Sequence, residues 1–340
     1  MLTQPQVQRY SAESGLRDIT IAENEIVLTY LLQLLAERGI LDKLAFKGGT
    51  CLRKMFVGSG GRFSTDLDFT RLEEHDHEEI ILDMMGAFEH PFHGIQFSIR
   101  DDGYYQTQDG LSWGVNPTYA HNWNPGGQSE IRLQVSRREF PTLPLSRNAQ
   151  CPQNYFRHLP FTPIDITCLA LPEIIAEKIR ACYQRSKARD IYDLSVFATR
   201  PLDQPLIRRL VVLKLWQAHD AFVPEAFLGK FADINDFDWE DLRQLVRQTQ
   251  AIQPDRITAA CLQGRPPPTR PCDVEDASKQ SSNQPDLNRQ TLDQERNSLS
   301  SYSTEPKNTG CCKPGMKGFA SEVIRGGPIV PARRFVLIRG

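Results

Sequence analysis

Residues 46–54 read FKGGTCLRK and residues 62–69 read RFSTDLDF, and these two stretches decide the fold of this 340-residue chain. The first predicts a short strand, a Gly-Gly turn and the beginning of a helix, and the second predicts another strand. A glycine pair between a strand and a helix lets backbone N–H groups at the helix N-terminus face an anion, typically phosphate. Gly48 and Gly49 are therefore predicted to form a phosphate-binding turn.

Two carboxylates define the second stretch. Asp66 and Asp68 are two residues apart on the predicted strand, so their side chains point to the same face. Leu67 and Phe69 alternate with them, which implies one buried face and one face of carboxylates. The like charges repel without a cation, and hard oxygen ligands suit Mg²⁺ bound together with nucleotide phosphates. Phosphate-binding turn and carboxylate pair together are the minimum set for metal-assisted nucleotidyl transfer.

Each of these signals is weak when taken separately. Gly-Gly turns are common and seldom bind phosphate, and a D-x-D pair more often marks a solvated strand edge. The alternation of Asp66 and Asp68 with apolar residues argues against the solvated edge. The two stretches together carry the prediction.

The chain before residue 262 mixes helical and strand-like patterns, which predicts an α+β front over residues 1–165 and a helical domain over residues 166–262 that completes the cleft. Residues 104–127, with Trp113, Tyr119 and Trp123, are interpreted as a loop-rich stretch. Helices are expected at 22–38, 77–89, 172–187, 190–199, 204–219 and 238–249, and further strands at 94–100 and 130–136.

Composition changes abruptly at residue 263. Between Gln263 and Gly310 only five residues are large and apolar, too few to offset the entropy of ordering the segment. Residues 263–340 are therefore predicted to be a disordered or low-complexity tail.

Charge and cysteine content exclude several classes of protein. The 40 basic and 42 acidic side chains nearly cancel, so the chain has no global attraction to nucleic acid or to an anionic membrane. No run of about 18 apolar residues and no apolar segment near the N-terminus are visible, so neither a membrane span nor a secretory signal is expected. The eight cysteines form no C-x-x-C pair and predict neither a disulfide framework nor a zinc site. We expect a reduced, cytoplasmic protein with no membrane partner.

A second informative stretch is PEIIAEKIRACYQRSKARDIYDL at residues 172–194. On a helix, Lys178 falls in the middle of an apolar stripe, where an unpaired ammonium group is costly to bury. Either its head reaches water along the helix, or the lysine meets phosphate inside a cleft. The stripe is formed by Ile174, Ile175, Ile179 and Cys182.

These motifs resemble the nucleotidyltransferase toxins of the AbiEii/AbiGii type, relatives of the MenT toxins in the polymerase-β-like nucleotidyltransferase superfamily. The likeness rests on KGGT-x-L-R-K, R-F-S-x-D-L-D-F, E-K-I-R-A and R-D-x-Y-D-L in that order. Gly-Gly-Thr replaces the usual Gly-Ser of the superfamily, and 16 residues separate Gly49 from Asp66, as expected for the AbiEii branch.

The resemblance implies a polymerase-β-like core, a mixed sheet with flanking helices, followed by a helical half. It also assigns roles by position. Asp66 would be the essential carboxylate and Asp68 its metal-binding partner, and Asp193 would only cap or orient a helix. The other implied catalytic residues are Lys178, Asp190 and Ser64, and the implied nucleotide- or phosphate-binding residues are Gly48, Gly49, Thr50 and Arg62.

One position departs from many members of the superfamily. They carry a third carboxylate on a neighbouring central strand, which helps to deprotonate the attacking hydroxyl. The best candidate strand here is 130–136, where Gln134 occupies the expected inward position. Glutamine cannot act as a base, so either Asp190 substitutes for it or this copy is impaired.

The function that follows from the resemblance is that of a toxin in a toxin–antitoxin system. It would use Mg²⁺ and an NTP to add nucleotides to an RNA acceptor such as tRNA, and a cognate antitoxin would neutralise it. Two alternatives remain: a small-molecule nucleotidyltransferase that modifies antibiotics, and an inactive nucleotide sensor. A basic groove would favour RNA over a small molecule, and its candidate residues are Arg132, Arg137, Arg138, Arg180 and Arg185.

Overall fold

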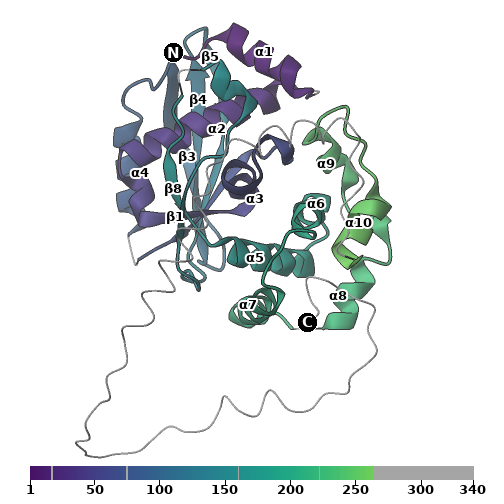
Figure 1. Cartoon of the computed structure of the whole chain (residues 1–340). Helices are drawn as coiled ribbons and strands as arrows, with labels where there is room; N and C mark the ends of the chain where they lie inside the picture. The colour runs from purple at the N-terminus through teal and green to yellow at the C-terminus, as the bar shows by residue number, and fades with distance from the viewer. Residues whose placement is uncertain (17, 74–75, 160, 222, 264–340) are drawn as a thin grey trace, which may run out of the picture. The chain divides into compact units, whose positions relative to one another are not determined.

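A computed structural model describes residues 1–263 except 17, 74–75, 160 and 222 (Figure 1). These residues belong to one compact unit. The predicted tail, except for Gln263, lies outside the described residues. The proposed division after residue 165 stays a prediction, and strand β8, which spans it, pairs with β1 in the sheet.

An eight-stranded mixed sheet carries the front of the protein. Its strand order is β3-β4-β6-β2-β1-β8-β7, and β5 pairs with β4. Strand β2 is antiparallel to β1 and parallel to β6, so the DLDFT stretch lies at the centre of the sheet. The strands are β1 Leu44–Lys47, β2 Asp66–Arg71, β3 Ile95–Gln106, β4 Ser112–His121, β5 Asn124–Glu130, β6 Arg132–Ser136, β7 Ser146–Ala149 and β8 Asp165–Cys168.

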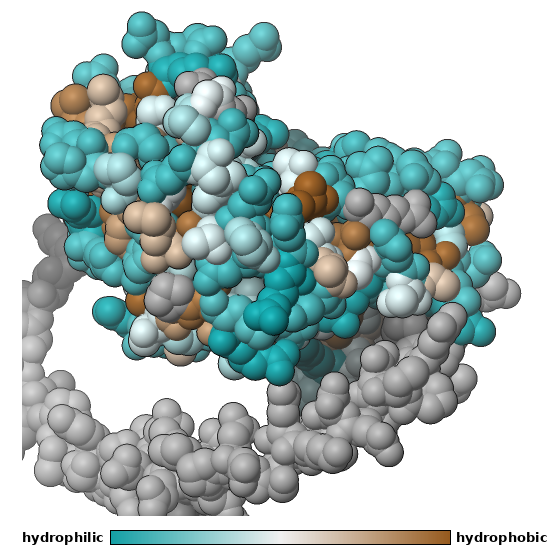
Figure 2. Space-filling model, turned by 90° about the horizontal axis from the view of Figure 1, so that it is seen from above, coloured by the Kyte–Doolittle hydropathy of each residue, from teal (hydrophilic) through white to brown (hydrophobic). Residues whose placement is uncertain are grey.

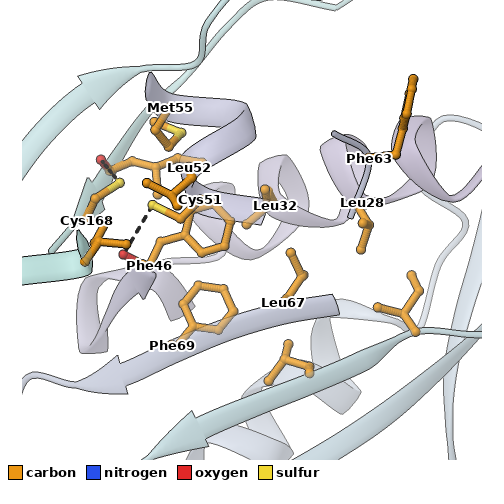
Figure 3. Close-up of a cluster of buried hydrophobic side chains, with 14 of the residues drawn as sticks. Leu28, Leu32, Phe46, Cys51, Leu52, Met55, Phe63, Leu67, Phe69 and Cys168 are labelled. Carbon is orange, nitrogen blue, oxygen red and sulfur yellow. Dashed lines mark hydrogen bonds between the residues drawn. The ribbon is translucent and has the colours of Figure 1, made fainter. Parts of the chain in front are cut away.

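The central strands have one apolar and one polar face, as the alternation in DLDFT predicts. Leu67 and Phe69 of β2 are at most 1 % exposed. Figure 3 shows both in a buried cluster with Leu28 and Leu32, which come from helix α2 (Ile19–Glu37). The opposite face of β2 carries Asp66 and Asp68, and the mixed sheet with flanking helices that the sequence predicts is confirmed.

Helix α2 is the most apolar long helix of the core. By length and composition it is the one helix in the described part of the chain that could cross a membrane, although the sequence predicted no such segment. In the structure 61 % of that window is buried, so its apolar side chains serve the core. The surface is different: Figure 2 shows a face dominated by hydrophilic residues, with hydrophobic ones in small groups.

The Gly-Gly turn leads into a helix, as predicted. Strand β1 ends at Lys47, helix α3 (Gly48–Cys51) follows at once, and the chain continues in a π-helical turn (Leu52–Val57). Helix α4 (His77–Ala87) lies where residues 77–89 predict it, and Asp76 caps it through Glu78 N–H.

Residues 166–263 are mainly helical, as expected. The predicted helices at 172–187, 190–199 and 204–219 are confirmed. The helix predicted at 238–249 is shorter than expected and ends at Gln244. Helix α1 (Gln4–Ser14) precedes α2 at the N-terminus. The helices of this half are α5 Leu171–Gln184, α6 Ala188–Phe197, α7 Gln204–Gln217, α8 Pro224–Lys230, α9 Trp239–Gln244 and α10 Pro254–Gln263.

The interpretation of residues 104–127 as loop-rich is wrong. Most of the stretch forms the end of β3, strand β4 and the start of β5, and Trp113 and Tyr119 of β4 are buried. Gly114, Asn116 and Pro117 are residues that typically mark turns and hide the strand pattern. Pairing of β4 with both β3 and β6 overrides these local preferences.

Candidate active site

The carboxylate pair lies on the polar face of β2. Asp66 and Asp68 are half-buried, and the register places Arg132 and Gln134 of β6 directly opposite them. Gln134 is therefore on the same face as the carboxylate pair, the inward position that the sequence predicts for it. Burial and the neighbouring charge of Asp66 raise the pKa of Asp68, although nearby cations act in the opposite direction. A cation bound between the two carboxylates would relieve their repulsion.

The two glycines of the turn are required by close side-chain contacts. Gly48 has a φ of 79°, and a Cβ there would lie 2.3 Å from Asp68 Oδ2. A Cβ on Gly49 would lie 2.4 Å from Arg62 Nη2 and 3.4 Å from Ser64 Oγ. The structure thus brings the turn, the carboxylate pair and Ser64 together. Only glycine leaves room for them.

Thr50 fixes the turn to strand β2. Its hydroxyl donates a hydrogen bond to the backbone carbonyl of Asp66 at 2.5 Å, and the residue is buried. Thr50 therefore lies beside the predicted phosphate site, where it holds α3 against β2.

Lys178 contacts two carboxylates of helix α6. Its Nζ lies 2.8 Å from Asp190 Oδ1 and 3.0 Å from Asp193 Oδ2, and the residue is 8 % exposed. The lysine on the apolar stripe is therefore neither unpaired nor snorkelling to water. Arg185 adds a bond from Nε to Asp190 Oδ2 at 2.8 Å.

Arg62 enters the same cluster from the other side. Its guanidinium binds both carboxylate oxygens of Asp193 and donates to the Phe63 carbonyl at 3.0 Å. Sequence reasoning gave Asp193 only a capping or orienting role, yet this residue links Arg62 to Lys178. Its position as the second aspartate of the R-D-x-Y-D-L string is the feature of the sequence that could have indicated this role.

Lys178 and Asp190 remain charged at neutral pH. Burial favours the neutral form of each group, but Asp190 and Asp193 raise the pKa of Lys178. Burial likewise opposes ionisation of Asp190, but Lys178 and Arg185 hold the pKa of its carboxyl far below the ordinary value. Asp190 is fully buried, and its ion pairs with Lys178 and Arg185 make it a weak base.

A second ionic cluster, which the sequence did not predict, lies next to the turn. Lys47 is on the same face as Asp68, and its Nζ lies 3.1 Å from Glu177 Oε2 on α5. Lys214 of α7 also approaches Glu177, at 3.4 Å. Burial would raise the pKa of Glu177, but Lys47 and Lys214 hold it at about 2.

Cations therefore surround the carboxylate pair on several sides. Lys47, Lys178 and Arg132 each lower the pKa of Asp68, and Asp68 in turn raises the pKa of Arg185. This arrangement suits a polyanion that reaches two acidic groups through a metal ion.

One residue of the predicted basic groove does not belong to this site. Arg180 is buried and binds Glu139 at 2.8 Å.

The residues present fit a divalent cation that is shared with a substrate. In the described part of the chain, no group of three or more His, Cys, Asp or Glu side chains could hold a metal ion by itself. Mg²⁺ typically binds through one or two carboxylates and completes its shell with substrate phosphates and water. Asp66 and Asp68 match that donor set.

Comparisons with known proteins agree with this geometry. The family described as nucleotidyl transferase AbiEii toxin, type IV TA system, matches residues 30–284. The comparison with curated proteins gives no match. Among solved structures, the nucleotidyltransferase toxin MenT4 of Mycobacterium tuberculosis is 27 % identical, with a TM-score of 0.59 over 74 % of this chain and 85 % of that one.

A putative nucleotidyltransferase from H. pylori is 19 % identical, with a TM-score of 0.41 over 67 % of this chain and 87 % of that one. The family match spans most of the chain, and family members are nucleotidyltransferases that generally use a divalent metal and an NTP and are paired with an antitoxin. This chain belongs to the AbiEii family of nucleotidyltransferase toxins.

Proposed function

We propose that this toxin transfers nucleotides from an NTP, with Mg²⁺, to an RNA acceptor such as tRNA and thereby blocks translation in the cytoplasm. A cognate antitoxin would neutralise it. The observation that carries the proposal is the contact between the Gly48 turn and Asp68, with Asp66 beside it and cations around both. That arrangement supports the roles we propose, a phosphate-binding turn beside a metal-binding pair.

The proposed roles follow from position. Mg²⁺ bound by Asp66 and Asp68 would neutralise the charge that develops on the transferred phosphate. The N–H groups of Gly48 and Gly49 would hold the leaving pyrophosphate, with Lys178 supplying positive charge nearby. Asp190 would act as a positioning residue that fixes Lys178, because it is buried and a weak base.

Gln134 does not by itself favour the inactive sensor. Phosphoryl transfer depends mainly on positioning and on electrostatic stabilisation, so a strong general base is dispensable. The two carboxylates and the turn are intact, which favours an active enzyme over a sensor.

The test measures incorporation of each labelled NTP into total RNA with Mg²⁺ and with EDTA. Wild type should label RNA only with Mg²⁺, and Asp66→Asn should lose this activity while its melting temperature stays equal or rises. The control is Asp165→Asn, an exposed aspartate on β8, which should remain active. Transfer to an aminoglycoside in place of RNA would establish the small-molecule alternative. Full activity of Asp66→Asn would refute the assignment of the site.

A further inference from the structure

The polar face of the sheet continues beyond the carboxylate pair. The strand register places Asp68 opposite Gln134, Gln134 opposite Gly114, and Gly114 opposite Tyr105. Residues that pair in this way point to the same face, so a row of four positions runs from β2 across β6 and β4 to β3. Tyr105 is therefore on the same face as the catalytic aspartates.

The ring of Tyr105 covers Gly114. A Cβ on Gly114 would lie 2.3 Å from Tyr105 Cζ and 2.4 Å from its hydroxyl oxygen, so the ring lies directly on the backbone of β4. This contact supports the hydroxyl end of the ring, and the Arg132 guanidinium carbon lies 5.9 Å from the ring centroid. Tyr105 as a whole is half-buried, which leaves part of the side chain open to a ligand.

Arg132 lies between this ring and the aspartates. Its Nε donates to the Tyr105 hydroxyl at 3.2 Å, and its Nη2 donates to Gln134 Oε1 at 3.0 Å. The hydrogen bond to Tyr105 is the largest cause that raises the pKa of Arg132, and the charges of Asp66 and Asp68 raise it further. Two hydrogen bonds thus hold the exposed Arg132 guanidinium in a defined position next to the carboxylate pair.

Arg132 differs from the other cations around Asp68. In the described part of the chain, Lys47, Lys178 and Arg185 each form an ion pair with a carboxylate. Both hydrogen-bond partners of Arg132, by contrast, are neutral side chains. Its charge is therefore the one in this set that a ligand phosphate can neutralise without breaking an ion pair.

The geometry of phosphoryl transfer indicates which substrate binds on the β6 side of β2. The attacking and leaving oxygens lie roughly in line across the transferred phosphorus. With pyrophosphate held at the Gly48–Gly49 turn, next to β1, the attacking hydroxyl approaches from the opposite side of β2. On that side β2 is followed by β6 and then by β4, whose Gly114 contacts the Tyr105 ring.

We propose that Tyr105 and Arg132 form the acceptor platform of this enzyme, on which the terminal nucleotide of an RNA acceptor stacks against the Tyr105 ring and pairs a phosphate with Arg132. The proposal rests on the proposed function and adds the residues that recognise the acceptor. An aromatic ring beside a guanidinium is the combination that binds single-stranded nucleic acid, since every base offers a face for stacking.

The experiment uses the full chain, one labelled NTP that wild type accepts, and deacylated bulk tRNA as the acceptor. Tyr105→Ala should raise the KM for tRNA roughly 10- to 100-fold, the usual loss for one base–aromatic stack, while the KM for NTP stays unchanged. Tyr105→Phe keeps the ring but loses the hydroxyl that accepts from Arg132, so its KM for tRNA should lie between those of wild type and Tyr105→Ala. Arg132→Gln should weaken tRNA binding and reduce the slope of log affinity against log salt by about 0.7 to 1.

A matched control exists on the same strand. Tyr104 is the neighbouring residue on the other face of β3, where it stacks on His77 at 5.5 Å. Tyr104→Ala should leave the KM for tRNA unchanged. If Tyr105→Ala and Arg132→Gln keep wild-type KM values for tRNA, or raise the KM for NTP instead, the platform is refuted while the proposed function stands. If wild type labels neither tRNA nor total RNA, the proposed function fails and the platform fails with it.

Discussion

Arg62, in the segment before β2, donates two parallel hydrogen bonds to Asp193 of α6, from Nε to Oδ1 at 2.9 Å and from Nη2 to Oδ2 at 2.8 Å. The two residues are 131 positions apart in the chain, and both are buried. Asp193 also lies 3.0 Å from Lys178. This single carboxylate therefore joins the glycine turn of the front, through Arg62, to the lysine of the helical half.

Asp193→Asn should lower both stability and transfer. The change leaves Arg62 with a neutral partner in a buried position, and breaking a buried pair typically costs about 3–5 kcal/mol. Arg62 and Lys178 would then lose their common anchor. Chemical denaturation gives the free energy of unfolding, and Asp165→Asn, at an exposed position, serves as the control. Unchanged unfolding of Asp193→Asn would show that the pair contributes nothing to the fold.

Lys178→Met separates structural from catalytic contributions. The substitution leaves Asp190 and Asp193 without their shared cation, but Arg185 and Arg62 still pair with them. We therefore expect a loss near or below about 3 kcal/mol, the low end of the cost for a broken buried pair. Transfer should fall on the order of 10²–10³-fold, as for the loss of one electrostatic donor.

The measurement for Lys178→Met is kcat at a temperature where the variant is fully folded, as judged by circular dichroism. A double variant, Lys178→Met with Asp193→Asn, tests the coupling between the two residues. Strict additivity of their unfolding free energies would contradict the contact at 3.0 Å.

Local patterns explain what the sequence could predict. The strand, turn and helix at residues 44–57 and the two-faced strand β2 depend on glycine, alternation and nearest neighbours. Strand β4 was missed because Gly114 and Pro117 typically mark turns, and its pairing depends on strands distant in sequence. A side chain at position 114 would collide with the Tyr105 ring, and no local sequence pattern encodes this contact.

Ion pairs were harder to predict for the same reason. Lys178 was recognised as an unusual residue in an apolar stripe, and its helix is confirmed. Its partners Asp190 and Asp193 come from the next helix, so the pairing depends on how α5 and α6 pack. Lys47 and Glu177 are 130 residues apart, and nothing in either local sequence indicates the other.

Gly48→Ala should impair transfer more than stability. The new methyl group would have to lie 2.3 Å from Asp68 Oδ2 at a φ of 79°, so the carboxylate must move and the backbone is strained by about 1–2 kcal/mol. Gly86→Ala is the control, because Gly86 has nothing within 4 Å and lies in helix α4. It should stabilise the protein by about 1 kcal/mol and keep activity. Equal activities of both variants would show that Gly48 does not position Asp68.

Glu177→Gln should change the response of the fold to acid. The pKa of Glu177 is about 2 in the folded protein, below its ordinary value of 4.5, because Lys47 and Lys214 outweigh the effect of burial. A lowered pKa stabilises the folded state above pH 4.5, and this contribution is lost as the pH falls from 4.5 towards 2. At neutral pH it is worth roughly 3 kcal/mol, from a difference of about 2.5 pH units.

The check is a series of urea unfolding curves for wild type and Glu177→Gln between pH 7 and the acid limit of folding. The difference between the two free energies of unfolding removes the contribution of all other acids, provided that they are unaffected by the substitution. This difference should be constant above about pH 5 and shrink steadily below it, because protonated Glu177 and glutamine are both neutral. Glu37→Gln, at a solvent-facing glutamate on α2, is the matched control. A difference that stays constant down to pH 3 would mean that Lys47 and Lys214 do not hold Glu177 as an ion pair in solution.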